Sequence, residues 1–192
     1  MIARKNAMST RLIGIYSPAP QSGKTFAATV LAHAGYQPVS FAEPLKRMIT
    51  EFLISFGYEK EQAIKLAWVD KAVVIQELNA SSRYLLQTLG TQWGRDYVCE
   101  DVWIRAWKAR AAKFDYVIAD DVRFPNEAEA VKQMGGEMWK IVRPSAGHDW
   151  SHISEGALDE WDGFDRIIEN TGTIEEFRAK IDLAISDATS QG

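Results

Sequence analysis

The sequence has 192 residues, of which 46% are hydrophobic and 25% are charged, a length and composition typical of one globular domain and not of a disordered chain. The formal net charge is -4, with acidic and basic residues interspersed. Proteins that bind duplex DNA usually carry a basic face, so we expect no stable binding to nucleic acid.

A single cysteine, Cys99, excludes an intrachain disulfide and a cysteine-based zinc site. Residues 1–10 contain Arg4 and Lys5 without an apolar segment after them, so we expect no signal peptide. No apolar run approaches the roughly 20 residues that span a bilayer. These observations favour a cytoplasmic protein that does not associate with membranes.

The first elements predicted in chain order are a strand, a helix, a second strand and a second helix. Residues 11–17 form a short apolar run that favours a buried strand, and residues 37–41 predict another. The predicted helix over residues 24–34 has Phe26, Val30 and Ala34 spaced to face a core. The helix predicted over residues 44–56 ends at Gly57 and carries an apolar stripe of Leu45, Met48, Ile49, Phe52, Leu53 and Phe56.

The middle of the chain, residues 59–112, is predicted to be wholly helical. Ser81 or Ser82 is a candidate N-cap for a helix that carries Leu85, Leu86 and Leu89 and stops at Gly90. A second helix is predicted from Val102 to Arg110. This stretch is too long for a simple crossover between strands, so we expect a subdomain at one end of the sheet, where open parallel sheets bind ligands.

The last third of the chain again alternates strands and helices. Strands are predicted over residues 116–119, 138–142 and 166–168, and helices over residues 126–134 and 173–185. The last helix carries a capping box of Thr173 with Glu176 and an apolar face of Ile174, Phe177 and Ile181. Alternation of this kind predicts an α/β fold with a parallel sheet covered on both faces.

The strongest chemical signal is Ser22-Gly23-Lys24-Thr25, between a predicted strand and a predicted helix. It matches the second half of a phosphate-binding loop, in which backbone N–H groups at the helix start cradle an anion, the lysine reaches the β- and γ-phosphates and the hydroxyl binds Mg²⁺. Pro18 stands where the pattern has glycine, and Pro20 lies within the loop, so we expect an altered entry to a working cradle. The alternative interpretation is a chance match at an ordinary helix start.

Asp120 and Asp121 follow the strand predicted over residues 116–119. An acidic residue at the end of a strand beside the phosphate loop binds Mg²⁺ or its water in enzymes of this kind. Adjacent side chains on a strand point to opposite faces, so we expect one of the two to serve the site and select Asp121. A solvated turn is the alternative.

Several stretches resemble the bacteriophage-type deoxynucleoside monophosphate kinases, a branch of the P-loop nucleoside monophosphate kinase group. They are FAEPLK at residues 41–46, LLQTLGTQWGR at 85–95, DVRFPNE at 121–127 and HISE at 152–155. IENTGT at residues 168–173 also resembles the end of dephospho-coenzyme A kinases, which are relatives in fold.

The resemblance implies a P-loop three-layer α/β/α fold with a five-stranded parallel sheet and a helical substrate-binding insertion. It implies that ATP and Mg²⁺ are used and that the acceptor is a deoxynucleoside monophosphate. We expect one kinase domain with a core at residues 11–42 and 114–186, a substrate-binding subdomain at 43–113 and a lid at 143–160. A homodimer is expected by analogy only, and a phage-encoded protein would act in the host cytoplasm.

Roles for individual residues follow from the resemblance and from the preference of phosphate for arginine. The predicted ATP-binding residues are Gln21, Ser22, Gly23, Lys24 and Thr25, together with Asn170 and Thr173, which are expected to frame the adenine by analogy with the relatives in fold. The predicted catalytic residues are Lys24, Asp121, Arg123 and Arg143, and the predicted Mg²⁺ ligands, partly through water, are Thr25 and Asp121. The predicted acceptor-binding residues are Glu43, Lys46, Arg83, Gln87, Trp93 and Arg95.

Other interpretations remain open at this point. Each arginine is equally consistent with a surface salt bridge, and Trp93 with a core position. The acceptor is alternatively dephospho-coenzyme A or a hydroxymethylated base in DNA, and a non-catalytic nucleotide-binding module is a further alternative. His148, Asp149 and His152 are too loosely spaced for a metal site, and no histidine partner supports Cys99 as a nucleophile.

Overall fold

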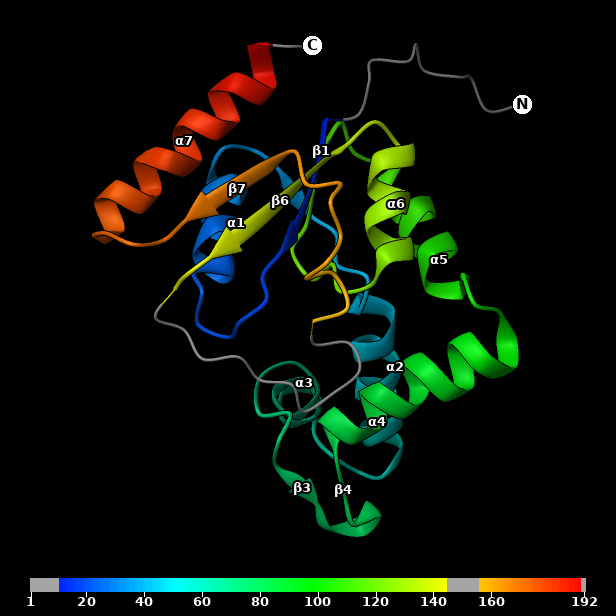
Figure 1. The fold of residues 1–192 in the computed structure, drawn as a ribbon. Coiled ribbons are helices and arrows are strands. Elements are labelled where there is room, and N and C mark those ends of the chain that lie inside the picture. The colour runs from blue at the N-terminus through cyan, green and yellow to red at the C-terminus, as the bar shows by residue number, and fades with distance from the viewer. Residues whose placement is uncertain (1–10, 145–155, 191–192) are drawn as a thin grey trace. The chain divides into compact units, whose positions relative to one another are not determined.

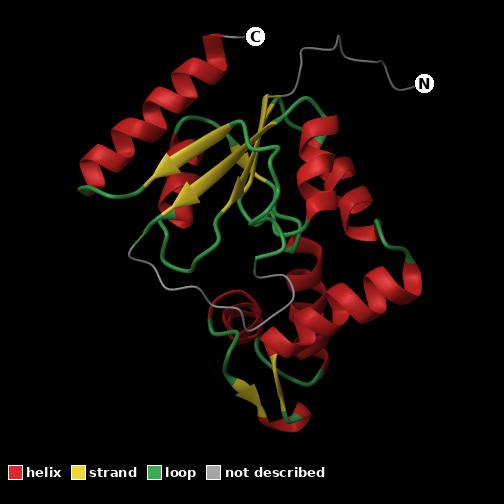
Figure 2. Ribbon diagram, viewed as in Figure 1, coloured by secondary structure: helices red, strands yellow, loops and turns green. Residues whose placement is uncertain are grey.

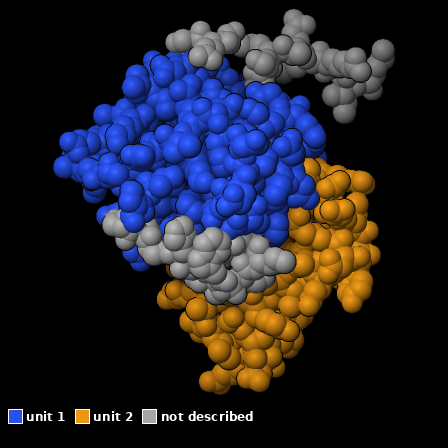
Figure 3. All heavy atoms as spheres, viewed as in Figure 1, with its two compact units in different colours: residues 1–40, 108–192 blue, residues 41–107 orange. Residues whose placement is uncertain are grey.

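The computed structural model describes residues 11–144 and 156–190 (Figure 1). Most of the segment predicted as a lid, and the HISE stretch and His148, Asp149 and His152, lie outside the described residues. The chain divides into two compact units, residues 1–40 with 108–192 (unit 1) and Phe41–Trp107 (unit 2), which are coloured blue and orange in Figure 3. Each unit is considered by itself below.

Unit 1 contains the predicted five-stranded parallel sheet, with strand order β2-β5-β1-β6-β7 (Figure 2). The strands are β1 (Arg11–Tyr16), β2 (Gln37–Pro38), β5 (Tyr116–Ala119), β6 (Glu137–Val142) and β7 (Arg166–Glu169). The central strand β1 is buried from Leu12 to Tyr16, as its apolar sequence predicts. The second strand is shorter than predicted, although the Val39 N–H still donates to the Ile118 carbonyl oxygen at 2.9 Å.

Helices cover both faces of this sheet and make three layers (Figure 1). Helices α1 (Lys24–His33) and α7 (Ile174–Ser190) pack against one face, in a core that includes Ile13, Ile15 and Trp139. Helix α6 (Pro125–Gln133) packs against the other face, where Val131 approaches Gly14. Successive residues of β1 point to opposite faces, which explains why Ile13 and Ile15 face one helix layer and Gly14 the other.

Two predicted helix faces in unit 1 need correction. Ala34 is exposed because α1 ends at His33, so Ala34 lies at the C-cap beyond the sheet contact. Helix α1 instead buries Ala27, Ala28, Val30 and Leu31. Ile174 is 67% exposed because it is the first residue of α7, whereas Phe177 and Ile181 are buried as predicted.

Unit 2 is more irregular than the predicted run of helices. Its elements are α2 (Glu43–Ser55), α3 (Lys60–Ile64), a π-helix η1 (Lys65–Val69), β3 (Val74–Ile75), a 3₁₀ turn η2 (Gln76–Leu78), β4 (Ala80–Ser81), α4 (Ser82–Thr88) and a π-helix η3 (Leu89–Val98). Helix α5 (Val102–Ala111) begins in unit 2 and ends in unit 1. The core of unit 2 contains Ile49, Leu53, Ala63, Ala67 and Ile75. In the same unit, Phe41 stacks on Trp107 with ring centroids 4.4 Å apart.

Three expectations for unit 2 are wrong. Residues 59–112 are not wholly helical, because the β-branched residues Val74 and Ile75 pair with β4 across a turn at Asn79, whose φ is 47°. The helix after Ser81, the observed N-cap, does not stop at Gly90 but continues as η3. Half of the apolar stripe of α2 is exposed, namely Met48, Phe52 and Phe56, because the core contacts only the side of Leu45, Ile49 and Leu53.

Candidate functional site

The phosphate loop connects β1 to α1, the position predicted from its sequence. Lys24 is the first residue of α1 and Thr25 the second. Gln21 and Gly23 have left-handed backbone conformations, with φ of 57° and 101°, on either side of the buried Ser22. Alternation of left- and right-handed residues turns successive N–H groups toward one side, which forms an anion-binding concavity, and the N-terminus of α1 adds partial positive charge.

Glycine is required at position 23 for two reasons. Its φ of 101° is strained for any residue with a Cβ atom. A Cβ atom there would also lie 2.6 Å from Asn170 Nδ2 and 2.8 Å from Phe177 Cε1. The backbone of the loop therefore lies directly against residues that follow β7 and form part of α7.

The entry to the loop carries the two prolines, which lack N–H donors. Here the Ser17 hydroxyl donates to the Ala19 carbonyl oxygen at 3.1 Å, and the Ala19 N–H donates to the hydroxyl oxygen at 3.4 Å. The Ser17 side chain thus closes a small turn over Pro18. The backbone donors available to an anion are those from Gln21 onward.

The two carboxylates that follow β5, those of Asp120 and Asp121, lie in different environments. Asp120 accepts a hydrogen bond from the Ser40 hydroxyl at 2.7 Å, and the Ser40 carbonyl oxygen accepts one from Arg110 Nη2 at 2.7 Å. Asp120 therefore links β5 to the residue after β2. Asp121 is partly buried and follows the strand that pairs with β1, so it lies at the same edge of the sheet as the phosphate loop.

Glu127 is a residue whose role the sequence did not indicate. Its side chain is buried, and Oε2 accepts hydrogen bonds from the backbone N–H groups of Arg123 at 2.8 Å and Phe124 at 3.2 Å. This carboxylate fixes the backbone at Arg123, while the side chain of Arg123 is exposed. The available signal was a glutamate three residues after Phe124, with Pro125 opening the helix, a typical helix-start pattern.

Two predicted residues contact the carbonyl side of the phosphate loop. Arg143, just after β6, donates from Nη1 to the Gln21 carbonyl oxygen at 3.4 Å. Asn170, just after β7, donates from Nδ2 to the Ser22 carbonyl oxygen at 2.9 Å. Thr173 instead forms the predicted capping box, in which its N–H donates to Glu176 Oε2 at 2.8 Å and its hydroxyl oxygen accepts from the Glu176 N–H at 3.2 Å.

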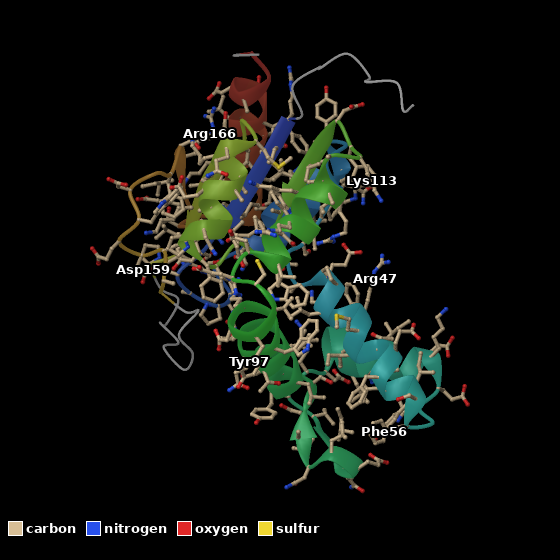
Figure 4. All side chains as sticks on the ribbon, turned by 90° about the vertical axis from the view of Figure 1, so that its right-hand side faces the viewer. Arg47, Phe56, Tyr97, Lys113, Asp159 and Arg166 are labelled. Atoms are coloured by element: carbon tan, nitrogen blue, oxygen red, sulfur yellow. The ribbon has the colours of Figure 1, made fainter. Side chains whose placement is uncertain are left out.

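The described end of the predicted lid is anchored beside the phosphate loop. The Tyr16 hydroxyl, at the end of β1, donates to Asp159 Oδ1 at 2.6 Å. Lys140 Nζ donates to the Asp159 carbonyl oxygen at 3.3 Å and lies 5.2 Å from the centre of the Phe164 ring. Asp159 is labelled in Figure 4, and its contacts attach residues 156–165 to β1 and β6.

In unit 2, two predicted acceptor-binding residues lie in the first turn of α2. Glu43 pairs with Arg47 at 2.7 Å, one helical turn later. Lys46 Nζ lies 4.9 Å from the centre of the Trp68 ring, within the range of a cation–π contact. The lysine head is therefore held against η1 by an aromatic ring.

The other predicted acceptor-binding residues follow one another along α4 and η3. Arg83 is an exposed residue of the first turn of α4, Gln87 and Arg95 are half-buried, and Trp93 is 46% exposed. The exposure of Trp93 argues against a plain core position. A π-helix inserts an extra residue per turn and often occurs at functional sites, and here it displaces Trp93 and Arg95 from the positions they would have in an α-helix.

Trp103 is a second residue that the sequence did not single out. Its Nε1 donates to the Gly90 carbonyl oxygen at 2.8 Å, and its ring centroid lies 6.1 Å from that of Trp93. A Cβ atom on Gly94 would lie 2.4 Å from Trp103 Nε1, so only glycine permits this approach. Trp103 thus supports η3 at Gly90, Trp93 and Gly94.

Comparison with solved structures shows a fold shared with a known kinase. A dephospho-CoA kinase from Campylobacter jejuni superposes with a TM-score of 0.52 and 12% identity, covering 93% of this chain and 97% of that one. The protein TT1252 from Thermus thermophilus gives a TM-score of 0.51 and 15% identity, covering 92% of this chain and 97% of that one. At these identities the likeness shows the P-loop three-layer fold.

Comparison with known sequences identifies the family. A protein of Acanthamoeba polyphaga mimivirus, provisionally named deoxynucleotide monophosphate kinase, is 33% identical over 189 residues, covering 88% of this chain and 93% of that protein. The deoxynucleotide monophosphate kinase of Enterobacteria phage T4 is 32% identical over 106 residues, covering 53% of this chain and 44% of that protein. The model of the deoxynucleotide monophosphate kinase family matches residues 56–181. The chain therefore belongs to the deoxynucleotide monophosphate kinase family and is a nucleotide kinase, a phosphotransferase.

Proposed function

We propose that the protein transfers the γ-phosphoryl group of ATP to a deoxynucleoside monophosphate and releases a deoxynucleoside diphosphate and ADP. The observation that carries the proposal is the phosphate loop, with left-handed Gln21 and Gly23 and with Lys24 at the start of α1. Membership of the family supports the choice of a deoxynucleotide as acceptor.

In this proposal ATP and Mg²⁺ bind to unit 1. Backbone N–H groups of residues 21–25 surround the phosphates, and Lys24 stabilises the negative charge on the transferred group. The Thr25 hydroxyl and the Asp121 carboxylate are oxygen donors of the kind that Mg²⁺ prefers, so the residues present fit the ion. Mg²⁺ would supply charge neutralisation at the phosphate oxygens.

Arg123 and Arg143 complete the proposed catalytic set. Phosphoryl transfer needs mainly positioning and cations around the transferred group, and a guanidinium meets both needs. The contact of Arg143 with the Gln21 carbonyl oxygen holds this side chain next to the phosphate loop. Residues 143–160 are the proposed lid, which would exclude water from the reaction.

The acceptor is proposed to bind to unit 2, within a substrate-binding subdomain at residues 43–113, while residues 11–42 and 114–186 form the core. Arg83, Arg95 and Lys46 would bind its 5′-phosphate, because arginine and lysine supply charged donors for phosphate oxygens. Glu43 would accept from the deoxyribose 3′-hydroxyl. The exposed face of Trp93 suits stacking on a base, and the Gln87 amide suits its hydrogen-bonding edge.

The test is ADP release from MgATP with a panel of acceptors: dTMP, dGMP, dCMP, dAMP, modified deoxypyrimidine monophosphates, ribonucleotides and dephospho-coenzyme A. We expect release that depends on one or a few deoxynucleoside monophosphates, with product identified as the diphosphate by chromatography. Release that depends on dephospho-coenzyme A alone, or no acceptor-dependent release while MgATP binds, would overturn the proposal.

A further inference from the structure

Two carbonyl oxygens of the phosphate loop, those of Gln21 and Ser22, accept hydrogen bonds from the side chains of Arg143 and Asn170. We propose that Asn170 is a positioning residue that holds the phosphate loop in its anion-binding conformation by fixing the Ser22 carbonyl group. The inference deepens the proposed function, because it rests on ATP binding at this loop. It assigns Asn170 to the phosphates rather than to adenine.

The geometry of the peptide bond gives the effect of this contact. In a planar trans peptide the C=O and N–H groups point in opposite directions. Asn170 Nδ2 holds the Ser22 carbonyl oxygen at 2.9 Å, so the Gly23 N–H of the same peptide unit is directed to the opposite side. The Arg143 contact with the Gln21 carbonyl oxygen acts on the Ser22 N–H in the same way.

Asn170 itself is held firmly by the sheet. Its N–H donates to the Val142 carbonyl oxygen at 2.8 Å, which continues the pairing of β7 with β6. Lys180 Nζ of α7 donates to the carbonyl oxygen of the preceding residue, Glu169, at 2.7 Å. Arg166, labelled in Figure 4, pairs with Glu137 at 2.9 Å and with Asp187 at 3.2 Å and so links β7 to β6 and to α7.

Phe177 completes the surface against which the loop rests. It is 3% exposed, its ring packs 5.8 Å from that of Phe26, and its Cε1 atom would lie 2.8 Å from a Cβ atom on residue 23. Asn170 and Phe177 therefore contact the loop backbone at adjacent points, one through a hydrogen bond and one through packing.

This chain has a particular need for such support. Pro18 and Pro20 remove two N–H groups from the first part of the loop, so the anion depends on the donors that follow. Gln21 adopts a left-handed conformation that is unfavourable for a residue with a side chain, and such residues persist where their surroundings hold them. The hydrogen bond from Asn170 lies one residue beyond this position.

The experiment compares Asn170→Ala and Asn170→Asp with the wild type. Affinities for MgATP and for magnesium tripolyphosphate, which has no base, are measured by displacement of a fluorescent ATP analogue. Hydrogen exchange of residues 21–24 is measured without nucleotide. Gln62→Ala and Gln62→Glu are the matched controls, because Gln62 is an exposed amide residue of α3 that undergoes the same loss of an amide and the same gain of charge.

We expect Asn170→Ala to weaken both ligands by the same factor, about three- to tenfold, as for the loss of one hydrogen bond. Exchange of the loop amides should become faster, while the Gln62 variants leave both measurements unchanged. A loss confined to MgATP would overturn the proposal in favour of an adenine contact. A loss seen in Asn170→Asp alone would indicate a charge effect and would also overturn it.

Failure of the proposed function gives a different result. If the wild type binds neither MgATP nor tripolyphosphate, ATP binding at this loop is wrong, yet the exchange measurement still tests the contact. Unchanged exchange of residues 21–24 in Asn170→Ala would overturn the role of Asn170 by itself.

Discussion

In the proposed function, the two units recognise phosphate groups with different parts of the polypeptide. Unit 1 relies on backbone groups, because N–H groups of the loop are aimed by a parallel sheet and by side chains on its carbonyl side. Unit 2 offers side chains along α4 and η3, supported by one tryptophan. We therefore expect substitutions in unit 1 to disturb the geometry of the phosphate loop and to have large effects. Substitutions in unit 2 should lower the affinity for the acceptor by smaller amounts.

The largest effect is expected for Lys24→Ala. Removal of the cation that stabilises charge on the transferred group should lower kcat by about 10³ or more. Lys113→Ala, an exposed lysine of unit 1 labelled in Figure 4, is the control and should keep normal turnover. Steady-state ADP release and thermal melting are the measurements. Activity of Lys24→Ala within tenfold of the wild type would contradict its assignment.

Arg83→Ala tests whether unit 2 binds the acceptor. Loss of a charged hydrogen bond to phosphate should raise the acceptor KM by about ten- to a hundredfold and leave the ATP KM unchanged. The control is Arg105→Ala, an exposed arginine of α5 in the same unit. An equal rise in both KM values would exclude Arg83 as an acceptor ligand.

A smaller effect is expected from Trp103→Phe, which keeps an aromatic ring but removes the Nε1 donor to the Gly90 carbonyl oxygen. Loosening of η3 should shift Trp93 and raise the acceptor KM by about three- to tenfold. Trp107→Phe makes the same change in the same helix, where the ring stacks on Phe41, and should lower the melting temperature without changing the acceptor KM. Indistinguishable acceptor KM values for the two variants would show that Trp103 supports stability alone.

The smallest effect is expected on the pH dependence of stability, and it comes from a hydrogen-bonded pair of side chains in unit 2. The Tyr58 hydroxyl donates to Glu77 Oε2 at 2.6 Å, which lowers the pKa of Glu77 below its ordinary value of 4.5 and raises the pKa of Tyr58 above 10.0. The pair therefore stabilises the fold above the unfolded pKa of Glu77, and this stabilisation is lost as the pH falls through its folded pKa. It is also lost as the pH rises through the folded pKa of Tyr58.

Tyr58→Phe should return the pKa of Glu77 toward its ordinary value, as read from NMR titration of the carboxyl carbon. Nucleotide turnover near pH 7 should not change. A Glu77 pKa that stays low in this variant would assign the shift to another group.

The sequence predicted unit 1 well because its elements are regular. The apolar run from Tyr116 to Ala119 forms a strand that is buried from Val117 onward, and the capping box of Thr173 and Glu176 opens α7 as expected. Hydrophobic periodicity wrongly predicted that Ala34 and Ile174, at helix ends, face the core. Burial of such residues depends on where the helix leaves the sheet. That position is a tertiary property with no local signal.

Unit 2 was predicted less well because π-helices and short hairpins have weak patterns. The helix after Ser81 passes Gly90 because Trp103, 13 residues later, donates to the Gly90 carbonyl group, a contact that sequence spacing does not reveal. In the site, the loop and the acidic strand end could be located from their motifs. Glu127 and Trp103 could not, because they act through backbone groups of other residues.

The boundary of unit 2 has a consequence for the history of the protein. Phe41 stacks on Trp107 at the two ends of this unit, and Ser40 and Arg110 are joined by a hydrogen bond just beyond them in unit 1. A segment whose ends meet can be lengthened, shortened or replaced as one piece without rerouting the strands that precede and follow it. In the proposed function the acceptor binds to this segment, so exchange of the segment would change the choice of acceptor and leave the phosphate chemistry of unit 1 unchanged.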